Sequence, residues 1–400
     1  MKIITPLLIA TSLLIGCGAD NDKKKKDFKI SQDSYAVQTV ASDYSSSQVA
    51  IGNLIGDRSA TQGLLTKAES NFTISTYENN LYHIGKNQID AISRYDATQS
   101  VSNSEWAYGA NHDDEGSANT YTLVQQNATN GYLIRYGSTF VLQVDPSAAL
   151  EENFVKAKID LSAYNYPGSE YPRMVDAVIA DNKLFVALQR LDGWAPKPAY
   201  IAVIDIETNE EIDTNIQEDG FKGIPLNATN TFSLVEHNGQ IYAAGRGGYN
   251  SDTGGLDVID TTTYAITQLI DESSCPQLID FSDDDNNSND SYYHVLDVAV
   301  VSDQLAYATL NIEIGYKTIE TKIVMINPST KELTILSQPT AINGKEISDL
   351  NIDSNDRLWV GIANADAPGI WVMDTDTNTI SGDFIELDMP AKRIEFLTVQ

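Results

Sequence analysis

One unit recurs along the chain after residue 30, and it constrains the fold more than any other feature. The unit is an apolar strand, a tight polar turn, a second apolar or aromatic strand, a variable loop, and a strand that ends in Asp or Asn before a Thr-rich turn. The closing residues are Asp96, Asp145, Asp205, Asp260, Asn327 and Asp374, with spacings of 49, 60, 55, 67 and 47 residues. Repeats of this length are typical of the blades of a β-propeller.

The number of blades follows from the six visible copies and from the two chain ends. Ala36 to Val40 and Gln48 to Leu54 have the composition of strands, and Arg393 to Val399 is an isolated alternating strand at the C-terminal end. Pairing the two ends would remove two exposed sheet edges. We therefore predict an all-β protein, a β-propeller of seven four-stranded blades closed by the N- and C-terminal segments, with six or eight blades as alternatives.

The Asp and Asn residues that close each unit have a structural explanation. Each is followed within three residues by Ser or Thr, as in Asp205-Ile206-Glu207-Thr208. That pattern is the chemistry of an Asx-type turn. We expect these side chains to hold turns and not to bind a ligand.

The N-terminal residues indicate export and a lipid anchor. Pro6 to Ile15 is an apolar run of signal-peptide length, and it ends in Leu14-Ile15-Gly16-Cys17, which resembles the bacterial lipobox. The resemblance implies acylation of Cys17, for instance by palmitate, and Gly18 after it implies the outer membrane of a Gram-negative bacterium. A secretory leader that happens to contain a cysteine is the alternative. We predict a lipoprotein signal peptide over residues 1–16, a lipidated tether over 17–30, and a single propeller domain over 31–400.

The charge balance limits the kinds of partner that the protein can bind. The chain has 26 Lys and Arg against 56 Asp and Glu, which gives a formal net charge of -30. A field this negative repels phosphate backbones, so nucleic acid is excluded as a partner of a basic face. Cations, neutral molecules and basic protein surfaces are compatible with it.

The two ends of the predicted blades differ in loop length. Connections between first and second strands, and between third and fourth, form one end, which we call the turn face; the remaining connections form the loop face. We expect every long insertion on the loop face: Ser102 to Asn119, Ser162 to Arg173, Leu191 to Lys197, Arg246 to Gly255, Asp271 to Ser291, Asn311 to Thr318, and Ala363 to Pro368. Long loops on a rigid ring are common binding elements.

Aromatic and Arg side chains in these insertions are the candidate ligand-binding residues. Such side chains supply large, stiff contact areas. The alternative for each aromatic ring is that it packs its own loop onto a blade. The candidates are Trp106, Tyr108, Tyr164, Tyr166, Tyr171, Trp194, Arg246, Tyr249 and Tyr316.

Three carboxylates share one position on the innermost strand. Asp176, Asp297 and Asp349 lie eight or nine residues before the second strand of their units, near the expected channel mouth. Clustered oxygens suit a divalent cation such as calcium. Capping of backbone N–H groups is the alternative. A second acidic segment, Asp280 to Asp290, lacks EF-hand spacing and is a solvated loop or a calcium site.

The lipobox, the blade pattern and the one-sided loops together resemble bacterial surface lipoproteins with YVTN-type β-propellers. Some of these accompany TonB-dependent transporters, so the resemblance implies capture of a ligand for uptake. The YVTN signature itself is absent, because the corresponding strands read Ile204-Asp205 or Met373-Asp374.

Two classes of function follow from these features. The first is a non-enzymatic binding protein, anchored to the membrane through Cys17, that captures a small ligand or protein partner on the loop face, for an outer-membrane transporter. The second is a metal-dependent lactonase-like or quinoprotein-like enzyme with Asp176, Asp297, Asp349 and His112 near a channel metal. A protein-assembly scaffold is a third alternative. The absence of nucleophile-elbow, phosphate-loop and dinucleotide motifs favours binding over catalysis.

Overall fold

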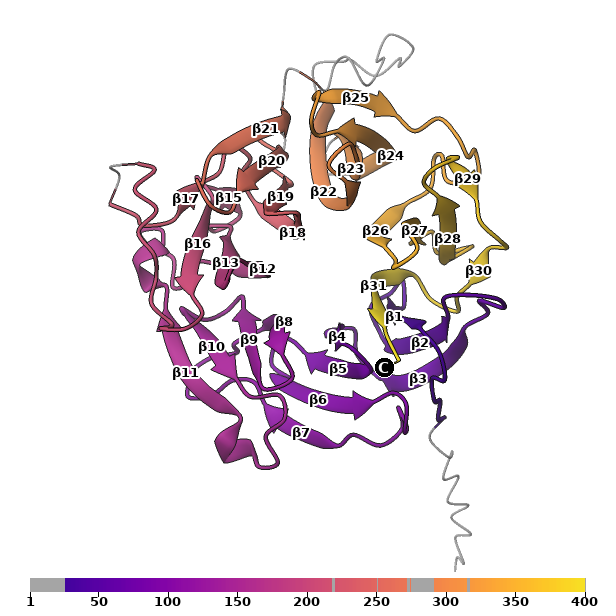
Figure 1. Ribbon diagram of the computed structural model, residues 1–400, viewed down its shortest axis with the longest axis horizontal. Helices are drawn as coiled ribbons and strands as arrows, with labels where there is room; N and C mark the ends of the chain where they lie inside the picture. The colour runs from indigo at the N-terminus through magenta and orange to yellow at the C-terminus, as the bar shows by residue number, and fades with distance from the viewer. Residues whose placement is uncertain are drawn as a thin grey trace, which may run out of the picture.

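A computed structural model describes residues 26–217, 220–249, 251–271, 274, 291–314 and 317–399. These residues form a β-propeller with seven blades of four antiparallel strands each around a central channel, as Figure 1 shows. The prediction of seven four-stranded blades is confirmed. No helix in this part of the chain has the length and apolarity needed to cross a membrane.

The first three blades, with strands named from the channel outward, are as follows. Blade 1 is β31 (Ala391–Leu397), β1 (Ser34–Val40), β2 (Ser47–Asn53) and β3 (Thr61–Lys67). Blade 2 is β4 (Phe72–Tyr77), β5 (Asn80–Gly85), β6 (Ala91–Asp96) and β7 (Trp106–Gly109). Blade 3 is β8 (Thr120–Asn127), β9 (Asn130–Arg135), β10 (Phe140–Val144) and β11 (Val155–Asp160), with short 3-10 turns η1 (Glu151–Asn153) and η2 (Ser162–Tyr164) beside it.

The other four blades complete the ring. Blade 4 is β12 (Met174–Ala180), β13 (Lys183–Leu188), β16 (Tyr200–Asp205) and β17 (Ile224–Pro225), with the small hairpin β14 (Leu191–Asp192) and β15 (Ala195–Pro196). Blade 5 is β18 (Thr231–His237), β19 (Gln240–Gly245), β20 (Gly255–Asp260) and β21 (Ile266–Ile270). Blade 6 is β22 (Ser291–Ser302), β23 (Leu305–Ile314), β24 (Lys317–Asn327) and β25 (Glu332–Ile335). Blade 7 is β26 (Ile347–Ile352), β27 (Arg357–Ile362), β28 (Gly369–Asp374) and β29 (Thr379–Ile380), and β30 (Ile385–Glu386) also pairs with β28.

The two chain ends close the ring in one sheet. The C-terminal strand β31 pairs antiparallel with β1, with Val37 opposite Ile394 and Tyr35 opposite Phe396. The last strand therefore becomes the innermost strand of the first blade, and neither end is left as an open edge. The predicted closure is confirmed.

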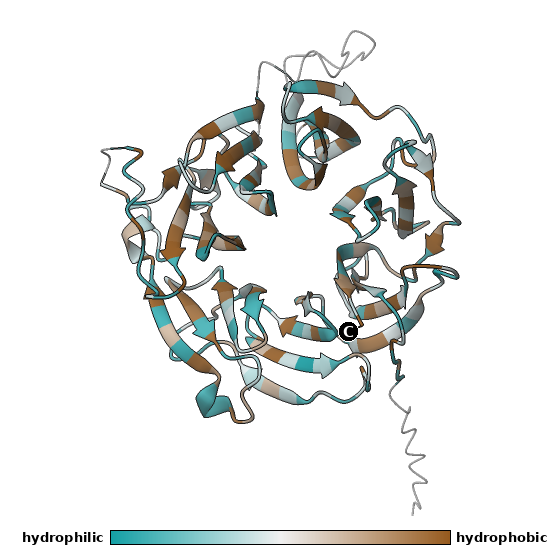
Figure 2. Ribbon diagram, in the orientation of Figure 1, coloured by the Kyte–Doolittle hydropathy of each residue, from teal (hydrophilic) through white to brown (hydrophobic). Residues whose placement is uncertain are grey.

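Apolar faces of neighbouring blades pack against each other and form the core. Figure 2 shows brown apolar positions recurring along the strands of every blade. Between blades 5 and 6, for example, Ala244 and Leu256 pack in one buried cluster with Val298 and Leu310. Because both sides of each sheet are covered, strands such as β16 are apolar on both faces and show little alternation.

The Asp and Asn residues that close each unit hold turns on the turn face. Asp374 Oδ1 accepts hydrogen bonds from Thr377 N (2.9 Å) and Thr377 Oγ1 (2.8 Å). These bonds to Thr377 hold the pKa of Asp374 below its ordinary value. The same contacts recur at Asp96 and Asn327, where Thr98 N and Ser329 N donate. The predicted Asx-type turns are present.

The packed chain begins slightly before residue 31. Phe28 and Ile30 pack at the interface of blades 1 and 2, and Ile30 N donates to Ala97 O (2.9 Å). Asp27 Oδ1 accepts a hydrogen bond from Ser100 Oγ (2.7 Å) in the β6–β7 connection. Residues 27–30, which we assigned to the tether, therefore lie against the turn face of the propeller.

Candidate functional site

A cavity of about 800 Å³ occupies the central channel. Its wall comes from the innermost strands β4, β12, β18, β22, β26 and β31, which surround the open centre of the ring in Figure 1. Tyr44 in the β1–β2 connection and Lys86 after β5 also contribute to the wall. Both belong to loop-face connections, so the cavity opens toward the loop face. The predicted asymmetry of the two faces thus coincides with the mouth of the channel.

The three aligned carboxylates lie in this cavity, as their spacing predicted. Asp176 Oδ2 accepts a hydrogen bond from Leu234 N (2.9 Å) of the next blade. Asp349 Oδ2 likewise accepts from Ile394 N (2.9 Å), which joins blade 7 to the closing strand β31. The aspartates therefore join the inner strands of adjacent blades around the channel.

Asp297 makes the most extensive of these contacts. Its Oδ2 accepts from Leu350 N (2.7 Å) of blade 7, and its Oδ1 accepts from Ser233 Oγ (2.8 Å) of blade 5 and from its own neighbour Val298 N (3.0 Å). One carboxylate thus connects three consecutive blades. Of the two alternatives that the sequence left open, capping of backbone N–H groups is the one observed, although the donors belong to the next inner strand and not to incoming loops.

These carboxyl groups are harder to ionise than ordinary aspartates. Burial raises the pKa of Asp297 to about 6, although its hydrogen bonds act in the opposite direction. Burial, and then the nearby charge of Asp297, raises the pKa of Asp349 well above its ordinary value. Two carboxylates that interact in this way titrate as a pair.

Within the described residues, no group of three or more His, Cys, Asp or Glu side chains is arranged to hold a metal ion. The structure therefore does not assemble Asp176, Asp297 and Asp349 into one calcium site, because each is directed to a backbone N–H group of its own neighbouring blade. His112 lies in the connection after β7, with its Nε2 atom 3.8 Å from Asp113 Oδ2. Asp280 to Asp290 lie outside the described residues.

Arg393 is a central residue of the channel that the sequence analysis missed. It lines the cavity on β31, and its Nε donates to Glu395 Oε1 (2.6 Å). Burial lowers the pKa of Arg393, but the carboxylates of Glu395 and Asp176 outweigh burial and raise it overall. A second cavity of about 280 Å³ continues toward the turn face, and Asp176, Leu234, Arg393 and Glu395 line both cavities. These four residues form the waist of the channel.

Aromatic rings line the cavity above the waist. Phe232 is 44% exposed and Tyr44 is 66% exposed, although most large apolar side chains in this fold are buried. Phe72 and Tyr121 also contribute to the wall, and Lys86 Nζ lies 5.2 Å from the centre of the Tyr121 ring. No sequence signal distinguishes these residues, because each is the first apolar position of a strand or lies in a short turn.

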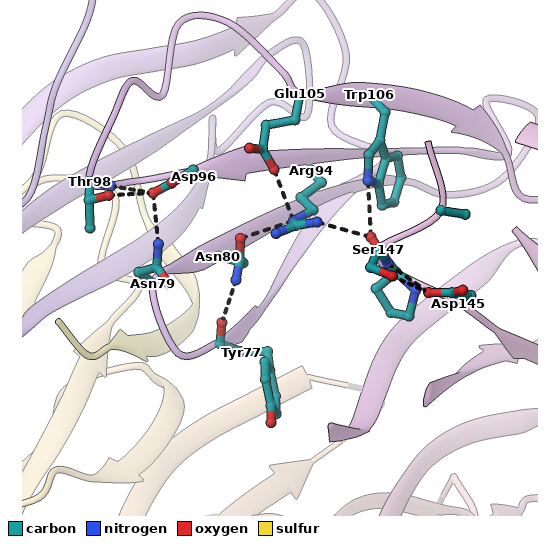
Figure 3. A network of polar contacts seen from close by, with 12 residues as sticks. Tyr77, Asn79, Asn80, Arg94, Asp96, Thr98, Glu105, Trp106, Asp145 and Ser147 are labelled. Atoms are coloured by element: carbon teal, nitrogen blue, oxygen red, sulfur yellow. Dashed lines mark hydrogen bonds and ion pairs between the residues drawn. The ribbon is translucent and has the colours of Figure 1, made fainter. Parts of the chain in front are cut away.

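Two of the predicted ligand-binding aromatics are structural instead. Trp106 begins the outer strand β7 at the turn face, and its Nε1 donates to Pro146 O (3.1 Å) of blade 3, as Figure 3 shows. Tyr108 stacks on Trp106 with ring centres 4.5 Å apart, and its hydroxyl donates to Ala148 O (2.8 Å). Strand β7 has only four residues, too few to give a strand pattern, so the sequence predicts a single loop over residues 102–119. The placement of Trp106 on the loop face was wrong, and its contacts hold blades 2 and 3 together.

The aromatics of the 162–173 connection differ in exposure. Tyr164 is buried in η2, where its ring stacks on Phe221 at 5.2 Å and its hydroxyl accepts from Gly223 N (2.6 Å). Tyr166 is half-buried beside Lys197, and Tyr171 is half-buried beside Arg173. The alternative of loop packing thus describes Tyr164, whereas Tyr166 and Tyr171 still present surface on the loop face.

The loops of blades 4 and 5 carry the most exposed candidates. Trp194 forms the tip of the β14–β15 hairpin and is 78% exposed, and Tyr249 is 47% exposed. Arg246 lies against the Tyr249 ring at 4.0 Å and pairs with the buried Glu313, with 2.6 Å between Arg246 Nη2 and Glu313 Oε2. His294 Nε2 lies 3.5 Å from the same carboxylate oxygen. Tyr316 and Cys17 lie outside the described residues.

The turn face is less uniform than the sequence suggested. Residues 206–223 connect β16 to β17 at this end and form a long insertion. It packs on blade 4 through Phe221, whose ring lies 4.9 Å from that of Tyr200. The expectation that all long insertions lie on the loop face was therefore wrong, because β17 has only two residues and gave no strand signal.

Comparison with solved structures identifies similar propellers. The chain is similar to the periplasmic gluconolactonase PpgL of Pseudomonas aeruginosa, with 11% identity, a TM-score of 0.57, and coverage of 92% of this chain and 100% of that one. A protein from Lactobacillus plantarum is similar at 14% identity and a TM-score of 0.56, over 92% of this chain and 99% of that one. The extracellular domain of BT4673 from Bacteroides thetaiotaomicron matches at 14% identity and a TM-score of 0.46, over 78% of this chain, which spans only 33% of that domain.

Neither family models nor curated sequences extend this result. No family model matches the chain, and no curated protein matches it. At these identities the solved structures establish the fold, a β-propeller, and not the activity.

Proposed function

We propose that this protein is an extracytoplasmic binding protein that takes a small ligand into the channel mouth on the loop face. The observation that carries the proposal is the cavity of about 800 Å³, which combines exposed aromatic rings with charged side chains. Concave sites of this size, with apolar walls and a few polar groups, are typical of small-molecule binding. The net charge of -30 and the lipobox-like leader fit an exported protein.

The position of the chain ends supports a membrane-anchored arrangement. Asp27 contacts Ser100 on the turn face, and Val399 N donates to Asp33 Oδ1 (2.9 Å) on the same face. A lipid on Cys17 would therefore attach from the turn-face side. The loop face and the channel mouth would then be directed away from the anchoring bilayer, where ligand and partner approach.

A protein partner, such as an outer-membrane transporter, would meet the loop face. Trp194 and Tyr249 lie on adjacent loops there, since a Cβ atom on Gly248 would lie 3.4 Å from Pro196 Cγ. Exposed Trp and Tyr side chains are common anchors of protein interfaces. We propose that these two rings contact the partner while the channel holds the ligand.

A plugged channel tests the binding proposal. Ser348 lines the cavity, and Ser348→Trp would fill part of it. Ala128→Trp adds the same ring to an exposed turn between β8 and β9, far from the channel mouth, and serves as the matched control. Pools of small molecules that raise the Tm of the wild type should raise that of Ala128→Trp equally and leave Ser348→Trp unchanged. An equal rise in all three proteins would place the ligand outside the channel and refute the proposal.

A hydrolytic enzyme is the second candidate. One observation favours it: Asp297 lines the cavity with a pKa raised to about 6 by burial, which suits proton transfer near neutral pH. A similar propeller is named a gluconolactonase. The wild type and Asp297→Asn should be compared for hydrolysis of a panel of sugar lactones, with metal content measured in parallel. Turnover in the wild type that disappears in Asp297→Asn would favour this candidate over simple binding.

A further inference from the structure

The ionisable side chains of the channel cavity are unevenly balanced. Acidic lining residues are Asp176, Glu236, Asp297, Asp349 and Glu395, and basic ones are Lys86, Lys392 and Arg393. Lys86 lies in the loop-face connection between β5 and β6. Lys392 lies at the loop-face end of strand β31, so both lysines are at the mouth of the channel. Deeper in the channel, Arg393 is the one basic lining residue of the described chain.

Arg393 is shared among several carboxylates and does not neutralise them all. Its Nε bonds to Glu395 at 2.6 Å, and its charge also acts on Asp176, Asp297 and Asp349. Four carboxyl groups around one guanidinium favour a cation here, because a bound cation stabilises the ionised forms that burial disfavours. In a channel enclosed by protein, the attraction between these carboxylates and a cation is stronger than it would be in bulk water.

A neutral acceptor adds to the same wall. Gln38 lies opposite Arg393 in the β1–β31 pairing, lines the cavity and is 0% exposed. Its side-chain Nε2 donates to Gln48 O (3.1 Å), but its Oε1 has no hydrogen-bond donor among the described residues. Asp349 accepts from Ile394 N through Oδ2, and its side chain is half-buried at the cavity wall. A buried acceptor without a donor is costly, and a ligand that carries donors removes that cost.

The aromatic rings above this region complete the argument. Phe72, Phe232 and Tyr44 line the cavity on the mouth side of the carboxylates. Aromatic faces attract cations and also stack against apolar groups. A metal ion would use none of this apolar surface, and no group of three or more His, Cys, Asp or Glu side chains in the described part of the chain is arranged to hold one. An anion would face the four carboxylates.

We propose that the channel binds a small organic cation, an ammonium group on an apolar or aromatic body. The ammonium lies beside Asp297 and Asp349 and donates to lone pairs of their carboxylate oxygens that the existing hydrogen bonds leave unused, and the apolar body lies against Phe232 and Phe72. This inference rests on the proposed function, because it assigns a ligand class to the same cavity.

A charge series on one molecular body tests the ligand class. Benzylammonium, benzyl alcohol and benzoate share a ring and differ in charge, and calcium ion is the metal probe. We expect calorimetric titration of the full chain at pH 7.5 to show benzylammonium bound at least about tenfold more tightly than benzyl alcohol, with benzoate weaker than both. Raised salt should weaken the benzylammonium complex, since the channel is open to solvent.

Matched variants assign the site. Asp349→Asn removes the charge and keeps an acceptor for Ile394 N, so benzylammonium affinity should fall at least about tenfold. Asp257→Asn is the control, because Asp257 is also a buried carboxylate that accepts a backbone N–H (Ala228 N, 2.8 Å) but lies outside the cavity lining. It should leave the affinity unchanged. Circular dichroism and Tm confirm that both variants fold.

Each other outcome overturns the inference in a distinguishable way. Tighter binding of benzyl alcohol or benzoate, lost in Ser348→Trp, would overturn the cationic class while the channel remains the binding site. Binding of calcium in place of benzylammonium would replace the organic cation with a metal. The inference would also be overturned if none of the probes bound, or if Asp349→Asn left the affinity for benzylammonium unchanged. In either case the small-molecule screen on Ser348→Trp still tests the proposed function independently.

Discussion

The half-buried carboxylate of Asp297 in the channel predicts how the stability of the propeller depends on pH. Its pKa is raised by burial from 3.8 to about 6. A folded pKa above the unfolded one means that stability is fully present below pH 3.8 and is lost as the pH rises through about 6. The difference corresponds to about 3 kcal/mol at most, because channel water screens part of the charge.

Replacement of this residue isolates its contribution. Asp297→Asn cannot ionise, so the part of the pH dependence between pH 4 and 7 that belongs to Asp297 should disappear. The pKa of Asp349 should also fall, since burial and the charge of Asp297 both raise it in the wild type. The free energy of unfolding of the wild type should therefore decrease with pH across this range by about 3 kcal/mol more than that of the variant.

The assay is guanidinium unfolding at half-unit steps of pH, followed by tryptophan fluorescence. Asp205→Asn is the control: Asp205 is half-buried at the end of β16, away from the channel lining, and hydrogen bonds from Thr208 hold its pKa below the ordinary value. Its contribution to stability is present above the unfolded pKa and is lost as the pH falls, so the control should keep the wild-type slope between pH 4 and 7. An identical slope in Asp297→Asn would show that Asp297 is not held in the buried state described above.

The remaining predictions concern the residues that the structure reassigned and the closure of the ring. Trp106→Ala should lower the free energy of unfolding by about 3–5 kcal/mol, whereas Trp194→Ala should change it by less than about 0.5 kcal/mol, both measured by chemical unfolding. Equal effects would contradict the conclusion that Trp106 is packed between blades while Trp194 is exposed. Arg246→Ala leaves the carboxylate of Glu313 buried without its partner and should cost about 3–5 kcal/mol, and Arg246→Ala/Glu313→Gln should recover part of that loss. Deletion of residues 391–400 removes the inner strand of blade 1 and should abolish the cooperative unfolding transition, which an added peptide of that sequence should restore.

The repeat made most of the fold predictable. Turn chemistry such as that around Asp374 is local, so the blade boundaries are encoded over a few residues. The alignment of Asp176, Asp297 and Asp349 also predicted correctly that all three line the channel, because equivalent positions of a repeat occupy equivalent places in a ring. What those carboxylates bind was open in the sequence, since the donors, Leu234 N and others, come from the next blade.

The candidate site was less predictable because its members come from unrelated segments. Arg393 belongs to no repeated motif, and only the closure of the ring brings it beside Asp176. Trp106 was placed on the wrong face because a four-residue strand inside a long segment has too short a period to be recognised. Tyr164 and Trp194 have similar loop sequences, yet one is buried and the other is 78% exposed.

The sequence by itself determined the architecture, a ring of blades with Asx turns closed by the two chain ends, and it favoured seven blades over six or eight. It could do so because alternation, turn residues and strand length act between neighbours in the chain. The tertiary structure alone decided which aromatic rings are buried, which carboxylates lie near one another in the channel, and where Arg393 lies among them. Those properties depend on distances between blades about 50 or more residues apart, and burial and electrostatic interaction follow distance in space, not separation along the chain.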